Sequence, residues 1–148
     1  LFDQWTYMKT YNQWRYTPPT HVICALDEAL KQFKAEGGVK GRHMRYNNNC
    51  RILVDGMRAL GFKTLLPDDL QAPIIVTFKM PANKDFNFEV FYNFLSKRGY
   101  IIYPGKLTVI PSFRIGCIGH ISEKEMKGAI NAVSDSLSEM GISTTAAA

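Results

Sequence analysis

The sequence predicts a two-layer α+β fold, in which a small, mainly antiparallel sheet is covered on one side by helices. Two observations favour this class. Apolar residues recur at helical spacing through the first 60 residues, whereas short runs rich in β-branched residues begin only after residue 60. The predicted order is three helices, two strands, a helix, two strands and a final helix.

The first third of the chain predicts two helices joined by an extended segment. Phe2, Trp5 and Met8 lie three residues apart, which predicts a helix over residues 2–13. Pro18 and Pro19 disfavour helix in the residues before them, so residues 14–20 should be extended. Thr20 is the expected N-cap of a helix over His21–Glu36, which Gly37-Gly38 should end or bend.

A longer helix is predicted over residues 39–60, with Met44, Ile52, Leu53, Met57 and Leu60 as its apolar residues. Gly61 is a suitable C-cap for this helix because glycine adopts the left-handed conformation readily. The run Asn47-Asn48-Asn49 has low helix propensity and predicts a bend.

The next part of the chain predicts short strands and one helix. The runs Phe62–Leu66 and Ile74–Phe78 are typical strands, and Pro67-Asp68-Asp69 between them predicts a turn. Asp85 or Asn87 is expected to cap a helix over Phe88–Lys97, which Gly99 ends.

The C-terminal part predicts two strands and a helix. The strands are expected at Tyr100–Tyr103 and Phe113–Ile118, with a Pro-Gly turn and a second proline between them. Ser122 and Glu125 form a capping box that opens a helix over Glu123–Met140. Residues 143–148 are expected to be a disordered tail.

Arg114 is the most informative polar residue because it stands within an apolar strand. Alternation along the strand places Arg114 on one face with Gly116 and Ile118, and Phe113, Ile115 and Cys117 on the other. A guanidinium in such a place is costly to desolvate unless an anion meets it. The pattern predicts an anion-binding arginine, or else one that pairs with a core carboxylate or reaches solvent at the strand end.

Composition excludes several function classes. No apolar run approaches the roughly 20 residues that a membrane-spanning helix needs. The net charge is +5, and part of it is concentrated over Lys40–Arg45, with Arg51 and Arg58 further on. This basic stretch fits a solvated face or a dimer contact as well as nucleic acid. Since no nucleic-acid-binding motif accompanies it, we expect neither a nucleic-acid nor a membrane partner.

Three cysteines, odd in number and widely spaced, argue against a disulfide framework and favour a reducing compartment. The expected location is the cytoplasm. The cysteines share no ligand spacing with the three histidines, so no metal site is expected. Lys106, in a Pro-Gly-Lys turn, is a candidate reactive amine, but a turn lysine beside glycine is usually solvated.

Four motifs in order along the chain resemble one enzyme family: WRYTPPTH (14–21), GMRALGF (56–62) with LLP (65–67), IYPGKL (102–107) and FRIGCIG (113–119). Together they are similar to the 2-aminoethylphosphonate–pyruvate transaminases, in the class V branch of the pyridoxal-phosphate aminotransferases. The resemblance implies the C-terminal part of a fold-type-I enzyme that uses pyridoxal 5′-phosphate and acts as a homodimer with active sites at the interface. The implied reaction moves an amino group from 2-aminoethylphosphonate to pyruvate and gives phosphonoacetaldehyde and alanine, so the substrates are small anions.

The resemblance also divides the chain. Residues 1–36 would end the large cofactor domain and include the interdomain helix, and residues 37–142 would form the small α+β domain. The cofactor lysine, the aspartate that faces the pyridine nitrogen and the stacking aromatic residue would all precede this chain. No catalytic residue is therefore expected within it, Lys106 does not match the cofactor lysine, and the chain alone should be inactive.

Three residues of this chain are assigned a role by the resemblance to the family. Thr17 matches a threonine that reaches the cofactor phosphate of the other subunit, and Arg15 beside it would add charge. Arg114 matches the arginine that pairs with the substrate carboxylate, because a planar guanidinium meets a carboxylate with two hydrogen bonds. The alternative for Thr17 is a residue of the turn before a helix.

Two other functions stay open at this point. One is another class V aminotransferase, such as an alanine–glyoxylate enzyme, because the groups that recognise the phosphonate lie largely outside this chain. The other is a non-catalytic α+β interaction module that lacks the cofactor domain.

Overall fold

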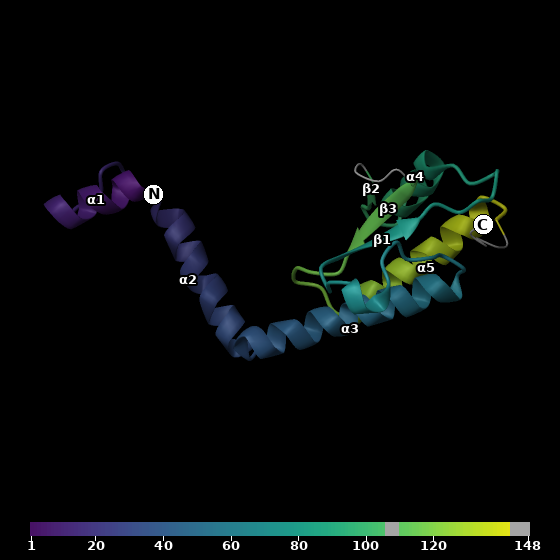
Figure 1. Cartoon of the computed structure of the whole chain (residues 1–148), viewed down its shortest axis with the longest axis horizontal. Coiled ribbons are helices and arrows are strands. Elements are labelled where there is room, and N and C mark those ends of the chain that lie inside the picture. Colours follow the sequence, from purple (N-terminus) through teal and green to yellow (C-terminus); the bar gives the residue numbers. More distant parts are fainter. Residues whose placement is uncertain (106–109, 143–148) are drawn as a thin grey trace. The chain divides into compact units, whose positions relative to one another are not determined.

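The computed structural model describes residues 1–105 and 110–142, so the predictions for Lys106 and for the tail at 143–148 lie outside the described residues. The chain divides into two compact units, Leu1–Arg42 and a larger unit that begins at His43 (Figure 1). Each unit is described by itself.

The first unit contains two helices at the predicted places, α1 (Phe2–Tyr11) and α2 (Thr20–Ala35). Thr20 is not the N-cap that the sequence predicts. Pro19 holds the cap position, and Thr20 is the first helical residue, with no side-chain cap hydrogen bond. The ring of Pro19 fixes the backbone at this position, so the helix begins at Thr20, one residue earlier than a cap at Thr20 would allow. The amide of Thr20 instead donates to the carbonyl of Pro18 at 2.8 Å.

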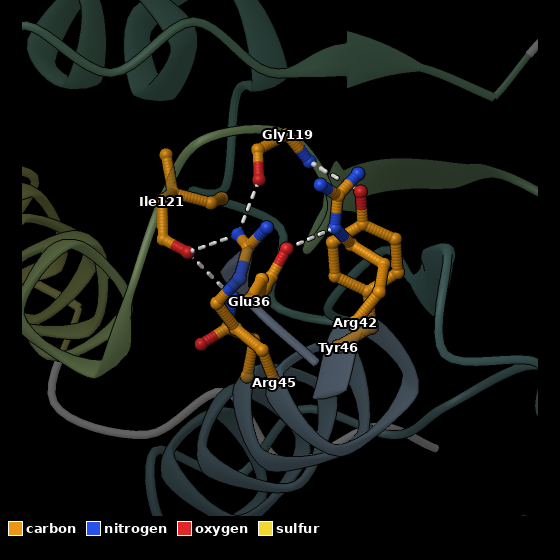
Figure 2. Close-up of polar contacts among 7 residues, drawn as sticks. Glu36, Arg42, Arg45, Tyr46, Gly119 and Ile121 are labelled. Carbon is orange, nitrogen blue, oxygen red and sulfur yellow. Dashed lines mark hydrogen bonds and ion pairs between the residues drawn. The ribbon is translucent and has the colours of Figure 1, made fainter. Parts of the chain in front are cut away.

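Two glycines with positive φ, Gly37 at 99° and Gly38 at 66°, end α2 as predicted and open α3 (Gly38–Ala59). Within the first unit Arg42 fixes the junction between α2 and α3, because it forms an ion pair with Glu36 (Figure 2). The guanidinium of Arg42 also stacks over the ring of Phe33 at 5.3 Å. A side chain at Gly41 would meet the carbonyl oxygen of Glu36, so the close approach here requires glycine.

In the second unit α3 continues without the bend predicted at Asn47-Asn48-Asn49. Low helix propensity is outweighed because Asn49 is buried and its amide donates to carbonyls of another segment. The helix ends as predicted at Gly61, which has a φ of 89°. There the amide of Phe62 donates back to the carbonyl of Met57 at 3.0 Å, the pattern of a glycine-terminated helix.

Three antiparallel strands form one sheet in the order β1-β3-β2. The strands are β1 (Ile75–Lys79), β2 (Tyr103–Pro104) and β3 (Ser112–Gly116). Arg114 in the central strand lies opposite Thr77 of β1 and opposite Tyr103 of β2. This arrangement confirms the small antiparallel sheet of the predicted α+β class.

Two of the three local predictions in this region are wrong. Residues 62–66 form no strand and pair with β1 through a single bridge, Thr64 with Phe78. The turn predicted at Pro67-Asp68-Asp69 is confirmed as a single 3-10 turn, η1 (Asp68–Leu70), in which the amide of Leu70 donates to the carbonyl of Pro67 at 3.1 Å. The strand predicted over Tyr100–Tyr103 is shorter and lies later in the chain, at Tyr103–Pro104, where these two residues pair with Arg114 and Phe113 of β3.

The two remaining helices have the predicted starts. The helix α4 (Phe88–Lys97) is capped by Asn87, whose side chain accepts a hydrogen bond from the amide of Val90 at 3.1 Å. The helix α5 (Glu123–Glu139) begins with the predicted capping box of Ser122 and Glu125.

An aromatic cluster forms the centre of the core on one face of the sheet. The ring of Phe113 lies 5.5 to 6.1 Å from the rings of Phe62, Phe78, Phe88 and Phe91. Buried residues of α3, α4 and α5 belong to the same core, so these helices cover that face (Figure 1). Among the described residues of the second unit, no helix covers the opposite face of the sheet (Figure 1).

Candidate functional site

Arg114 stands in the middle of the uncovered face of the sheet. Its neighbours in β3, Phe113 and Ile115, are buried on the core face, as strand alternation predicts. Arg114 itself is half-buried between half-buried Thr77 and exposed Tyr103, its partners across the ladder. The strand therefore holds the guanidinium stem rigidly while the head faces away from the core.

The guanidinium of Arg114 is incompletely satisfied. Its Nη2 donates to the carbonyl oxygen of Pro104 at 3.3 Å, and its Nε is buried without a hydrogen-bond partner. Among residues 1–105 and 110–142 no carboxylate forms an ion pair with it, so the alternative of a core carboxylate finds no partner there. A buried N–H without an acceptor is costly, and an anion that accepts from it would remove this cost.

Space is available beside this arginine on the same face. A side-chain carbon added at Gly116, two residues along the strand, would meet no atom within 4 Å. A planar anion can therefore approach the guanidinium, and the Pro104 contact fixes the plane in which the remaining donors point. This geometry suits a carboxylate, which takes two parallel hydrogen bonds from an arginine.

Three residues of α3 hold the loop that follows β3. Arg45 donates through Nη1 to the carbonyls of Gly119 and Ile121, the latter at 2.9 Å (Figure 2). The hydroxyl of Tyr46 accepts from the amide of Gly119 at 3.5 Å. Asn49 donates to the carbonyls of Cys117 and Ile121 at 3.2 and 3.1 Å. These contacts fix the path of the chain directly after Arg114.

Sequence reasoning missed these positioning residues. It assigned Arg45 to a basic face and Asn49 to a bend in the helix. The available signal is helical periodicity, because Asn49 shares a helix face with the apolar Leu53. A polar residue at such a position is buried only where it is hydrogen-bonded.

The other two predicted site residues, Arg15 and Thr17, lie in the first unit, in the segment between α1 and α2. Thr17 is exposed, and neither its hydroxyl nor its amide finds a partner within the described part of the chain. Arg15 stacks on the ring of Tyr16 at 5.3 Å and lies 3.7 Å from the carboxylate of Asp3. Both partners of that ion pair are exposed, so it is weak and can be exchanged for another anion.

Comparisons with known proteins give a consistent result over most of the chain. No family model matches it. It is 51% identical over 142 residues to the 2-aminoethylphosphonate–pyruvate transaminase 1 of Polaromonas sp., and 53% identical over 142 residues to transaminase 2 of Burkholderia lata. Both alignments cover 96% of this chain but 38% of the relative. The chain therefore spans well under half the length of the relatives it matches.

Solved structures of lower identity support the fold alone. The ureidoglycine–glyoxylate aminotransferase of Bacillus subtilis aligns with a TM-score of 0.79 at 19% identity, over 97% of this chain and 37% of that one. An aspartate aminotransferase of Thermus thermophilus aligns with a TM-score of 0.70 at 16% identity, over 94% of this chain and 38% of that one. The α+β arrangement is thus one that occurs in aminotransferases.

Proposed function

Because this chain is homologous over 142 residues to one part of the 2-aminoethylphosphonate–pyruvate transaminases, we propose that it supplies the substrate-carboxylate site of such an enzyme. The proposed reaction moves an amino group from 2-aminoethylphosphonate to pyruvate and gives phosphonoacetaldehyde and alanine. The chain spans 38% of those relatives, so the remaining catalytic groups are proposed to lie in the part that it does not span.

The observation that carries the proposal is the unsatisfied guanidinium of Arg114. The carboxylate of pyruvate or alanine would accept hydrogen bonds from the terminal N–H groups of the guanidinium, because Nε is buried. The contact of Nη2 with the Pro104 carbonyl would keep the guanidinium plane fixed while the substrate binds. Arg114 would thereby orient the substrate and neutralise its charge without taking part in proton transfer.

The donors in the first unit suit the phosphate of pyridoxal 5′-phosphate. Thr17 is exposed, and neither its hydroxyl nor its backbone amide has a partner among the described residues. Arg15 would add a positive charge, since its pairing with Asp3 is exposed and long. When bound, the cofactor supplies the electron sink that amino transfer requires, and Thr17 and Arg15 would anchor its phosphate.

The domain organisation and assembly are part of the same proposal. Residues 1–36 would belong to the cofactor domain and residues 37–142 to the small domain. In the first unit neither α1 nor α2 has a buried residue, and large apolar side chains of both, among them Phe2, Trp5, Leu26 and Leu30, are exposed. Such surface is usually covered in the complete protein, which supports a larger cofactor domain and a homodimer. The free cysteines support a cytoplasmic location.

A donor and acceptor survey of the complete protein that carries this chain tests the proposal. With pyruvate as acceptor we expect alanine to form from 2-aminoethylphosphonate much faster than from aspartate or other amino acids. If alanine with glyoxylate is instead the preferred pair, the protein is another class V aminotransferase. If no amino transfer occurs with any pair while pyridoxal 5′-phosphate is retained, the proposed function is wrong.

A further inference from the structure

Thr77 of β1 lies directly across the ladder from Arg114 of β3. The residues on either side of it, Val76 and Phe78, are fully buried on the core face. Strand alternation therefore places the Thr77 side chain on the uncovered face. Since residues in opposite positions of an antiparallel ladder are close neighbours on one face, this face presents a hydroxyl beside Arg114.

The backbone hydrogen bonds make this the closer of the two kinds of cross-strand pair. The carbonyl of Thr77 accepts from the amide of Leu65 at 2.8 Å, on the side of β1 that faces away from β3. The amide of Met80, just after β1, instead donates to the carbonyl of Pro111 before β3 at 2.9 Å. Because these bonds alternate between the two sides of a strand, Thr77 and Arg114 form a non-hydrogen-bonded pair. In such a pair the Cα atoms lie about 4.5 Å apart, rather than about 5.5 Å.

The Thr77 side chain is held in place while its hydroxyl is available to a ligand. The strand is fixed on its outer side by the Leu65 amide and by the bridge between Thr64 and Phe78. Threonine is β-branched, which restricts its χ1 angle. Among residues 1–105 and 110–142 the hydroxyl has no hydrogen-bond partner, and it is not one of their buried unpaired atoms, so solvent can reach it.

A carboxylate has acceptor sites beyond those that one arginine fills. Its two oxygens offer about four lone-pair sites, and two parallel hydrogen bonds from a guanidinium occupy only half of them. A hydroxyl on the same face can donate to a third site. The neighbouring position of β3 leaves room for this, because a side-chain carbon added at Gly116 would meet no atom within 4 Å.

Building on the proposed function, we infer that Thr77 is a further substrate-binding residue, whose hydroxyl donates a hydrogen bond to the carboxylate that Arg114 holds. The hydroxyl is neutral, so it adds direction rather than charge. A donor on β1 together with the guanidinium on β3 restricts the tilt of the carboxylate of pyruvate or alanine. The two strands thereby orient the rest of the substrate relative to the cofactor.

The test measures carboxylate binding without turnover, by titration calorimetry of the complete protein with propionate, an unreactive three-carbon carboxylate. Thr77→Val keeps the shape and the strand preference of the residue but removes the hydroxyl. Its affinity for propionate should fall about tenfold or more, as expected for one hydrogen bond to a charged group. Thr77→Ser keeps the hydroxyl and should bind propionate within about threefold of the unsubstituted protein.

Thr64→Val is the matched control. Thr64 is another half-buried threonine beside the same strand, but its hydroxyl accepts from Arg58 of α3 at 3.1 Å. This variant should bind propionate as the unsubstituted protein does. If Thr77→Val does not fold, a comparison of Thr77→Ser with Thr77→Ala isolates the hydroxyl in the same way.

Steady-state kinetics separates a binding role from a structural one. In Thr77→Val the KM for pyruvate should rise about tenfold while kcat changes less than about threefold, because the contact is present in the ground state and in the transition state. An unchanged affinity for propionate in Thr77→Val would overturn the inference and leave Thr77 as a residue that only favours the strand, as would a failure of the unsubstituted protein to bind propionate. If the unsubstituted protein binds propionate but transfers no amino group to pyruvate, the proposed function fails, and the titrations still decide the role of Thr77.

Discussion

The side-chain amide of Asn49 lies 3.2 Å from the carbonyl oxygen of Cys117, and this hydrogen bond ties α3 to the chain that leaves β3. Cys117 stands three residues after Arg114, so the contact fixes one end of the strand that presents the guanidinium. A second hydrogen bond from the same amide reaches Ile121 at 3.1 Å. One buried side chain thus holds both ends of the loop between β3 and α5.

Replacing Asn49 should therefore destabilise the fold. In Asn49→Ala the buried carbonyl of Cys117 loses a donor, whereas the carbonyl of Ile121 keeps the hydrogen bond from Arg45. We expect the free energy of unfolding to fall by roughly 1–3 kcal/mol. Urea denaturation measures this loss as a lower midpoint with an unchanged slope. Asn47→Ala is the matched control, because Asn47 is exposed on the same helix, and its effect should stay within about 0.5 kcal/mol. Equal losses in the two variants would show that the buried contacts carry no stability.

Arg114→Lys should not be a conservative change. Lysine keeps the positive charge but loses the planar fork, so catalytic efficiency towards pyruvate in the complete protein should fall by roughly 2–4 kcal/mol of transition-state stabilisation. Steady-state kinetics measures the loss, and the thermal midpoint should change little. Arg51→Lys, on the exposed side of α3, is the control and should retain its activity. An efficiency within about twofold of the unsubstituted enzyme would exclude Arg114 as the carboxylate site.

Thr17→Ala should weaken retention of pyridoxal 5′-phosphate by about 1–2 kcal/mol, the range for one hydrogen bond to a charged group. Equilibrium dialysis of the complete protein measures the dissociation constant. Thr17→Ser keeps the hydroxyl and should restore most of the affinity, whereas Thr20→Ala changes a threonine of the first turn of α2 and should have no effect. In mixed dimers the defect should follow the site of the opposite subunit. An unchanged dissociation constant would leave Thr17 as a turn residue.

The capping box of α5 should make stability depend on acid pH. Hydrogen bonds from the hydroxyl and the amide of Ser122 lower the pKa of Glu125 below its ordinary value. A lowered pKa means that the stabilisation is present above the unfolded-state pKa and is lost as pH falls through the folded-state pKa. The thermal midpoint should thus exceed that of Glu125→Gln at neutral pH, and the difference should shrink between roughly pH 5 and pH 3. Ser122→Ala should reduce that difference, and a difference independent of pH would contradict the assignment.

Local sequence patterns predicted the structure correctly where the stabilising contact lies between residues a few positions apart. Asn87, the pair Ser122 and Glu125, and Gly61 each fix a helix end through contacts with the adjacent turn, and the structure has these ends where the sequence predicts them. Strand alternation also placed Phe113 in the core and Arg114 on the opposite face. The helix α2 illustrates the limit, since a proline displaced its expected cap by one residue.

Pairing and burial between distant segments were decided only by the tertiary structure. Residues 62–66 have the composition of a strand, but only Thr64 pairs with the sheet, because strand formation needs a partner backbone along the whole run. Asn49 joins the core because Cys117 and Ile121 offer it acceptors, which helix propensity cannot reveal. By itself the sequence determined the helices and the residue that faces away from the core, whereas packing determined which segments paired as strands and which polar groups found partners.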